Sequence, residues 1–265
     1  MKALLLGGLV VFLGGGVAWN ALPDRFSHAP RPTSHAPSGR QRPDLESNVP
    51  YDGRFTFVRI RFAPLGGGEG WGGRDVKWDH DYPRGERNFA RIMHELPLVP
   101  TRLRESNILT LDDPELTKYP VAYLCEPGFW APTDAEAAGL RAYLRKGGFV
   151  IFDDFAGTHW YNFAEQIRKV LPDVRLVPLD TTHPIFDSFF HIESLDFDHP
   201  NYPVKAQFYG IFEDNDPAKR LMAIVNYNND IGDYWEWSDE GFLPIALSNQ
   251  AYRLGVNYVV YAMSH

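Results

Sequence analysis

Apolar residues along the middle of the chain form short runs typical of β-strands. Phe55–Phe62 alternates apolar and polar residues and is rich in β-forming side chains, so it predicts a first strand. Val121–Cys125 and Phe149–Phe152 are continuous apolar runs, as expected for strands buried on both faces. Weaker strand patterns cover Val99–Leu103, Ile108–Leu111 and Val174–Leu179.

Helical spacing fills the stretches between these runs. After Pro83 the apolar residues recur every three or four positions, which predicts a first helix. Thr133 and Glu136 have the spacing of a capping box, which predicts a second helix that ends at Gly147-Gly148. A third helix is predicted over Tyr161–Leu171. Strands alternating with helices predict an α/β fold, a flavodoxin-like parallel sheet covered by helices on both faces. In such sheets ligands bind beyond the carboxyl ends of the strands.

The C-terminal part departs from this alternation. Gln207–Glu213 and Leu221–Tyr227 predict an antiparallel pair, because a short polar turn containing Pro217 separates them. A final helix is predicted over Leu247–Tyr261. The parallel sheet therefore carries an antiparallel C-terminal addition.

The N-terminal fifty residues predict export. Met1-Lys2 precedes the uncharged apolar run Ala3–Ala18, so residues 1–22 are expected to be a signal peptide or an N-terminal membrane anchor. Residues 23–50 contain six prolines and repeat the letters SHAP, which predicts a disordered linker. One domain over 51–265 is expected to follow, in the periplasm or facing it from the membrane.

Charge and cysteine content exclude several function classes. The net charge is −8, and the acidic excess lies beyond residue 50, because residues 1–50 hold five of the 26 basic and three of the 34 acidic side chains. An acidic domain does not attract a phosphate backbone, so no nucleic-acid partner is expected. The single cysteine, Cys125, excludes a disulfide within the chain and any CxxC motif, and its apolar strand predicts a buried thiol.

Five stretches carry a resemblance to a known family. They are WDHDYPRGERNF (78–89), LRAYLRKGGFVIFDD (140–154), HPIFDSFF (183–190), NDIGDYWEW (229–237) and AYRLGVNYVVYAMS (251–264). In this order they resemble the bacterial "domain of unknown function 4159" family. The resemblance covers about residues 55–264 and implies a fold like that of class I glutamine amidotransferases, often an envelope setting, and no established reaction.

The amidotransferase comparison directs attention to KGGFVIFDDFAG (146–157). In those enzymes a cysteine nucleophile sits on the turn after the central strand, whereas this chain has Asp153 and Asp154 there. The nucleophile and its His-x-Glu partners are both missing from the expected positions. Glutamine hydrolysis is therefore not expected, and whether the domain is an enzyme stays open.

Polar residues cluster at the predicted strand ends and loops. Asp79, His80 and Asp81 precede a helix, while Asp153, Asp154 and His159 follow the central strand. Such carboxylates and imidazoles can hold a divalent metal or divide acid and base roles, but they can equally cap helices or turns. The catalytic candidates are Asp81, Asp154 and His183. The ligand-binding candidates are Trp78, Asp79, Asp81, Asp153, Asp154, His159, His183, Asp230 and Trp235.

Two hypotheses follow from these residues. The first is an envelope binding module for a protein, peptide or carbohydrate, since aromatic faces and carboxylates suit such surfaces. The second is a metal- or carboxylate-dependent hydrolase built on Asp81, Asp154 and His183. No cofactor is required by the first hypothesis, and a divalent metal is the one cofactor that the second leaves open.

Overall fold

The computed structural model describes residues 45–66, 69–70, 73–96, 99–198, 200 and 204–265. The predicted signal or anchor segment and linker residues 23–44 lie outside this part of the chain. Among the described residues, no helix is long and apolar enough to cross a bilayer. Residues 45–50, expected to end the linker, lie against β4 (Thr101–Leu109): the side chain of Asn48 donates to the carbonyl of Ile108 and accepts from its N–H.

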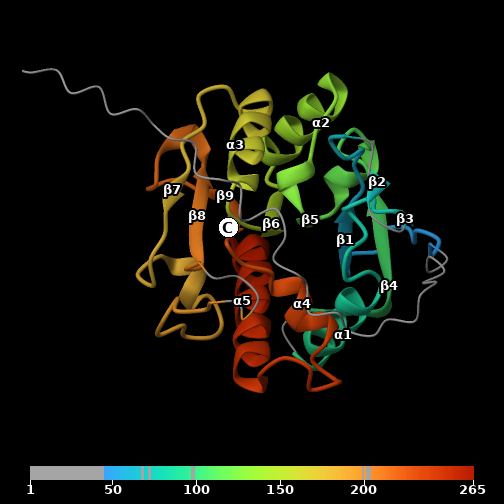
Figure 1. Ribbon diagram of the computed structural model, residues 1–265, viewed down its shortest axis with the longest axis vertical. Coiled ribbons are helices and arrows are strands. Elements are labelled where there is room, and N and C mark those ends of the chain that lie inside the picture. Colours follow the sequence, from blue (N-terminus) through green and yellow to red (C-terminus); the bar gives the residue numbers. More distant parts are fainter. Residues whose placement is uncertain (1–44, 67–68, 71–72, 97–98, 199, 201–203) are drawn as a thin grey trace, which may run out of the picture.

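A seven-stranded mixed sheet forms the centre of the described structure (Figure 1). Its order is β4-β1-β5-β6-β9-β8-β7; the first five strands are mutually parallel, and β8 and β7 are antiparallel to their neighbours. The strands other than β4 are β1 (Phe55–Ile60), β5 (Val121–Cys125), β6 (Phe149–Phe155), β7 (Val177–Pro178), β8 (Gln207–Phe212) and β9 (Leu221–Tyr227). The predicted α/β, flavodoxin-like class and its antiparallel C-terminal addition are confirmed.

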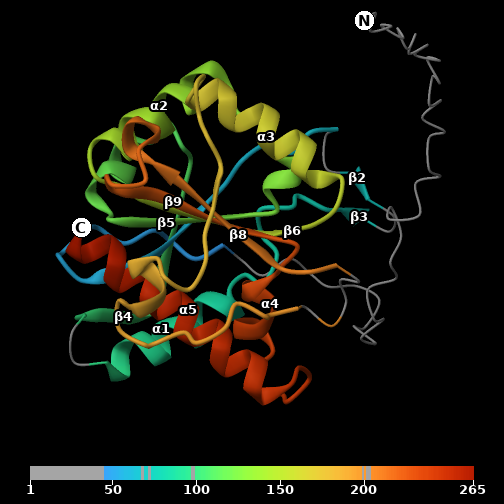
Figure 2. The same cartoon turned by 90° about the vertical axis from the view of Figure 1, so that its left-hand side faces the viewer.

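Helices cover both faces of the sheet. Figure 2 shows α2 (Asp134–Arg145) and α3 (His159–Val170) on one face, and α1 (Arg84–Glu95), α4 (Ile231–Glu236) and α5 (Ile245–Ser264) on the other. Alternate strand residues enter the two resulting cores. In β5, Val121, Tyr123 and Cys125 face α1 and α5, whereas Ala122 and Leu124 face α2 and α3. Burial on both faces explains why these strands are continuous apolar runs.

Most predicted elements are found near their predicted bounds, with two corrections in the strands. The two strands expected at Val99–Leu103 and Ile108–Leu111 are one strand, β4, with an irregular register: Phe55 pairs with Thr101 but Phe57 pairs with Ser106. The strand expected over Val174–Leu179 is reduced to the two residues of β7. In both places hydrogen bonds to a neighbouring strand determine how long the strand is. The local pattern of apolar residues gives no information about those hydrogen bonds.

Arg59 is a charged residue in the middle of β1 and is nonetheless buried. Its Nε donates to Oε1 of Glu86 on α1, and Nη1 donates to the carbonyl of Trp78 at 3.0 Å. The ion pair lets a charged strand residue face the apolar core, and the hydrogen bond to Trp78 attaches the loop before α1 to the sheet.

Candidate functional site

Three parallel strands end together at one edge of the sheet. Glu126 follows β5, Asp153 and Asp154 lie near the end of β6, and residues 228–230 follow β9. The pairing between β6 and β9 contains a bulge, because Phe152 pairs with Val225 and Phe155 pairs with Tyr227. Two residues of β6 thus oppose one of β9, which re-aims the side chains of Asp153 and Asp154.

Left-handed backbone conformations gather at this edge. Lys77, Asp81, Glu126, Asp154 and Asn228 have φ between 47° and 67°. Such values are uncommon for residues other than glycine and are concentrated at functional sites, where the surrounding structure holds them. These five residues come from four separate segments of the chain, so the backbone strain is shared by the segments that meet at this edge and is not confined to one loop.

Asp153 is fully buried and acts as a structural centre. Its Oδ1 accepts a hydrogen bond from Asn226 at 3.0 Å, and its Oδ2 accepts one from the hydroxyl of Tyr123 at 2.9 Å. Oδ2 also accepts the backbone N–H groups of Ile231 and Gly232 at the start of α4. Burial raises the pKa of Asp153 although these donors oppose the rise. With both oxygens engaged, Asp153 holds α4 against the sheet.

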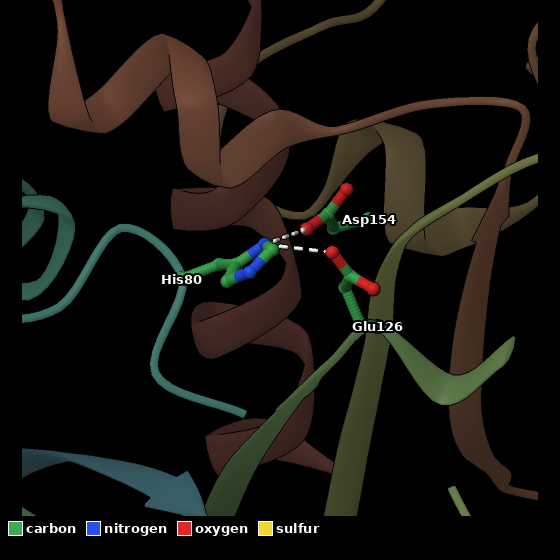
Figure 3. Close-up of side chains that lie close together, drawn as sticks. All are labelled: His80, Glu126 and Asp154. Atoms are coloured by element: carbon green, nitrogen blue, oxygen red, sulfur yellow. Dashed lines mark ion pairs between the residues drawn. The ribbon is translucent and has the colours of Figure 1, made fainter. Parts of the chain in front are cut away.

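His80, Glu126 and Asp154 form the centre of the site (Figure 3). Nδ1 of His80 lies 2.7 Å from Oε1 of Glu126 and 3.5 Å from Oδ2 of Asp154. Burial lowers the pKa of His80, but the charge of Glu126 and the hydrogen bonds to Asp154, Asp75 and Glu126 outweigh it, so the pKa lies well above its usual value. In this state the imidazolium is the cation that two buried carboxylates share.

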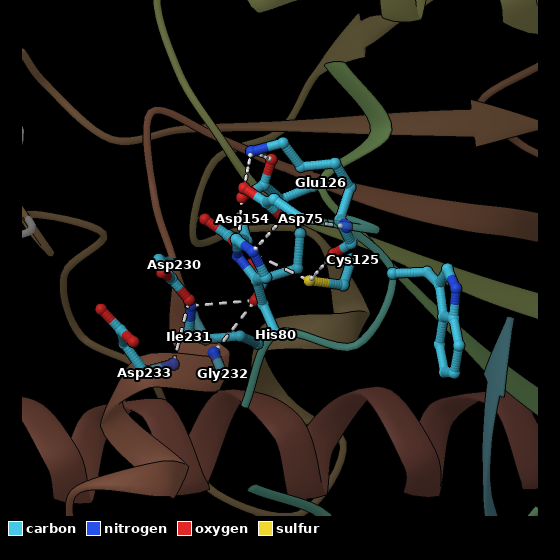
Figure 4. A network of polar contacts seen from close by, with 12 residues as sticks. Asp75, His80, Cys125, Glu126, Asp154, Asp230, Ile231, Gly232 and Asp233 are labelled. Carbon is cyan, nitrogen blue, oxygen red and sulfur yellow. Dashed lines mark hydrogen bonds and ion pairs between the residues drawn. The ribbon is translucent and has the colours of Figure 1, made fainter. Parts of the chain in front are cut away.

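Asp75 and Lys77 complete the polar network toward solvent (Figure 4). Oδ1 of Asp75 lies 3.0 Å from Nε2 of His80, and Nζ of Lys77 lies 2.7 Å from Asp75 and 3.3 Å from Glu126. Side-chain exposure falls from 35% at Asp75 to 14% at His80 and 4% at Asp154. The carboxylates of Glu126 and Asp154 therefore lie beneath a layer formed by Asp75, Lys77 and His80.

Asp81 extends the cluster inward. The carboxylate of Asp81, the thiol of Cys125 and the carboxylate of Asp154 each offer an atom within 4.8 Å of the others. Among the described residues, Oδ2 of Asp81 has no hydrogen-bond partner, although only 8% of the residue is exposed. Burial, followed by the charges of Asp233 and Asp154, raises the pKa of Asp81 well above its usual value.

Cys125 is the predicted buried thiol. It is fully buried, and Sγ donates to Oδ2 of Asp154 at 3.5 Å. Burial and the charge of Asp154 raise the pKa of the thiol well above its usual value. Nucleophilic attack requires a thiolate, which this environment disfavours.

The structure brings Asp81, Asp153 and Asp154 together but does not bring His183 to them. His183 precedes the short 3₁₀-helix η3 (Pro184–Asp187), where its Nδ1 accepts the N–H of Ile185 at 3.2 Å. Its ring packs against Phe212 and Tyr261. The grouping of His183 with Asp81 and Asp154 is therefore corrected: a cap and two aromatic contacts explain His183, and His80 lies beside Asp154 instead.

The aromatic part of the predicted ligand surface is also corrected. Trp78 and Trp235 are 6% and 1% exposed, and Trp235 packs on Phe89 with ring centroids 4.5 Å apart. Trp130 is fully buried as well, and Trp71 lies outside the described residues. Buried indoles present no face to a ligand, so Trp78, Trp130 and Trp235 are core residues.

The remaining candidates lie around the cluster. His159 is half-buried at the start of α3, and its ring packs edge-on against Phe129 just after Glu126. Asp230 caps α4 by accepting the N–H of Asp233, and burial and the charge of Asp154 raise its pKa. Asp79 is half-buried in the loop that carries His80.

Sequence reasoning missed Asp75, Lys77 and Glu126 as members of the site. Glu126 had a usable signal, because it directly follows the buried strand Val121–Cys125 as Asp153 follows Phe149–Phe152. No local pattern marks Asp75 or Lys77. They reach the cluster only because Lys77 turns the chain with a φ of 67°.

Comparison with known proteins gives a family and no activity. The family model described as Domain of unknown function (DUF4159) matches residues 57–263. No curated protein matches the chain.

Proposed function

The chain belongs to the DUF4159 family, and we propose that its domain is a binding module that captures a cation at the carboxyl edge of β5, β6 and β9. The observation that carries this proposal is the charge of the site. Carboxylates of Asp75, Asp81, Glu126 and Asp154 lie there, and Lys77 and His80 form ion pairs with them. Buried carboxylates are stable only when they are paired or protonated, so an added positive charge stabilises this arrangement.

The proposed setting is the cell envelope. The apolar run after Met1-Lys2 and the proline-rich segment after it support export followed by tethering through residues 1–22 or release after their cleavage. The partner then reaches the domain from the envelope space. A protein or peptide fits better than a carbohydrate, because amino and guanidinium groups are cationic whereas Trp78 and Trp235 offer no sugar platform.

Thermal unfolding with a panel of cations tests this function. The panel is spermidine, a lysine-rich peptide and the chlorides of Mg²⁺, Ca²⁺, Mn²⁺ and Zn²⁺. We expect at least one of them to raise the melting temperature of the parent and to lose that effect in Asp154→Asn, since a ligand that binds only the folded state stabilises it. Asp180→Asn is the matched control, because Asp180 is exposed and its side chain accepts hydrogen bonds from the nearby Thr182. If every cation shifts D154N and the parent equally, the proposed site is wrong.

A second candidate function is a metal- or carboxylate-dependent hydrolase. The backbone at Asp154 favours it: a φ of 60° at the bulge near the end of the central parallel strand β6 places a carboxylate on strained backbone, with His80 Nδ1 3.5 Å away. Asp81 and Asp154 keep their predicted places in this candidate, and His80 replaces His183. Activated ester, amide and phosphoester substrates test it; turnover that survives both D154N and His80→Gln would exclude this site as the source.

A further inference from the structure

The cluster contains a set of donor atoms arranged around Oδ2 of Asp154. His80, Glu126 and Asp154 each offer an atom within 4.8 Å of the others, and so do Asp81, Cys125 and Asp154. Oδ2 of Asp154 is common to both groups, because it lies 3.5 Å from Nδ1 of His80 and 3.5 Å from Sγ of Cys125. Two sets of three donors therefore share the carboxylate of Asp154: one contains His80 and Glu126, and the other contains Asp81 and Cys125.

The spacing of the donors suits a small dication. Four ligands at about 2.0–2.1 Å from a tetrahedral zinc ion lie about 3.3 Å from one another. The separations of Nδ1 of His80 from Glu126 and Asp154, 2.7 and 3.5 Å, lie on either side of that value. The proton that Nδ1 now shares with Glu126 occupies the position that a metal would take.

The other nitrogen of His80 is held as in many metal sites. Nε2 lies 3.0 Å from Oδ1 of Asp75, and Asp75 is in turn held by Lys77 at 2.7 Å. Histidine ligands commonly bond through their second nitrogen to a carboxylate, which fixes the ring and makes the metal-binding nitrogen more basic. Asp75 stands in that outer position.

Asp81 supplies an independent sign that a ligand belongs here. Its Oδ2 is buried and has no hydrogen-bond partner among the described residues, although buried polar atoms are normally satisfied. The carboxylate lies within reach of Asp154 and Cys125 in the same cluster. A cation among these groups would give the orphaned oxygen a partner.

We infer that His80, Glu126 and Asp154, assisted by Asp81, bind a first-row transition-metal dication of which Zn²⁺ is the probe, with Asp75 as the outer-shell partner of His80. This inference rests on the proposed function, because it names the cation that the site captures. A mixed nitrogen and oxygen set next to a thiol selects zinc and its neighbours, whereas Ca²⁺ and Mg²⁺ prefer oxygen alone.

Calorimetric titration of Zn²⁺ into the full chain, purified without a polyhistidine tag, tests the inference. The parent is expected to bind one equivalent with micromolar affinity or tighter, and H80Q and D154N are expected to lose this binding. Asp75→Asn is expected to bind about 10- to 100-fold more weakly, the usual effect of removing an outer-shell partner. Ca²⁺ and Mg²⁺ are expected to give no comparable binding.

Two histidine variants serve as controls. His191→Gln is matched to H80Q, since His191 also pairs with a carboxylate, Asp187, but is exposed; it is expected to bind as the parent does. The double variant His28→Gln with His35→Gln is expected to do the same, which separates the site from the two SHAP histidines.

Several results would overturn the metal assignment. They are absence of Zn²⁺ binding in the parent, binding that H80Q and D154N retain, loss of binding in H28Q/H35Q, and equal affinity for Ca²⁺. If the assignment fails while spermidine or the lysine-rich peptide still stabilises the parent and not D154N, the site captures an organic cation, and the proposed function survives. If D154N binds every one of these probes as the parent does, the proposed function fails too.

Discussion

Asp154 combines a functional position with a costly backbone conformation. Its φ of 60° is tolerated by asparagine and aspartate, whose short polar side chains bond locally, and is poorly tolerated by β-branched residues. We therefore expect Asp154→Val to lower the free energy of unfolding by about 1–2 kcal/mol relative to Asp154→Asn. Both variants remove the same charge, so chemical denaturation of the pair compares the backbone preference and the remaining side-chain hydrogen bonding at residue 154. Equal stability would show that the conformation at residue 154 costs nothing.

The ion pair between Arg59 and Glu86 is the second residue-scale feature with a measurable consequence. Both side chains are buried, so Glu86→Ala leaves an unpaired guanidinium in the core. We expect it to reduce the free energy of unfolding by about 3–5 kcal/mol.

The double variant Arg59→Met with Glu86→Leu is the control for that prediction. It removes both charges and keeps apolar volume, so its stability is expected to lie closer to the parent's than that of E86A. A double variant less stable than E86A would contradict this expectation. It would mean that the ion pair stabilises the fold beyond the neutralisation of each charge by the other.

At the scale of residues, the sequence predicted the position of a site residue where the topology of the sheet alone determines that position. Asp153 and Asp154 lie near the end of the buried parallel strand β6, and the carboxyl ends of such strands converge at one edge. His183 shows the limit of that reasoning: it is chemically suitable, but its segment belongs to η3 and packs on Phe212 and Tyr261. Only tertiary packing separates it from His80.

At the scale of elements, helix starts provide a matched comparison. Thr133 begins α2 with a complete capping box, whereas Thr158 begins α3 without a side-chain cap hydrogen bond. Thr133→Ala is therefore expected to lose about 1 kcal/mol of stability, and Thr158→Ala much less. Equilibrium denaturation of the two variants measures the difference; equal losses would contradict the capping assignment.

The elements also show which local signals are readable. The capping box and the apolar runs predicted α2, β5 and the start of β6, because those signals lie within the segment itself. The short helix α4 has one local signal, the cap residue Asp230, and is too short to show a helical apolar period. It is six residues long, and its first N–H groups are satisfied by Asp153, 78 residues earlier in the chain.

At the scale of the whole molecule, β4 forms one edge of the sheet and residues 45–50 cover part of it. Asn48 exchanges two hydrogen bonds with the backbone of Ile108, and Val49 exchanges two with the side chain of Asn107. A fragment of residues 45–265 is therefore expected to be more stable than one of residues 51–265, by about 4 kcal/mol at about 1 kcal/mol for each of these four hydrogen bonds.

Urea denaturation of the two fragments checks this prediction, and light scattering reports edge-to-edge association of the shorter one. Identical stability would place the start of the domain at residue 51, as the composition of the linker suggested. The class of fold was predictable because strands and helices alternate, whereas the proline content of residues 23–50 did not indicate that Asn48 and Val49 bond to β4.

Capture of a metal cation at the edge of β5, β6 and β9 is tested by an anomalous difference map from crystals of the protein grown with Zn²⁺, recorded at the zinc absorption edge. We expect a peak bounded by His80, Glu126 and Asp154, with Asp75 still bonded to the far nitrogen of His80. A map with no peak there, and with Nδ1 of His80 still bonded to Glu126, would contradict it.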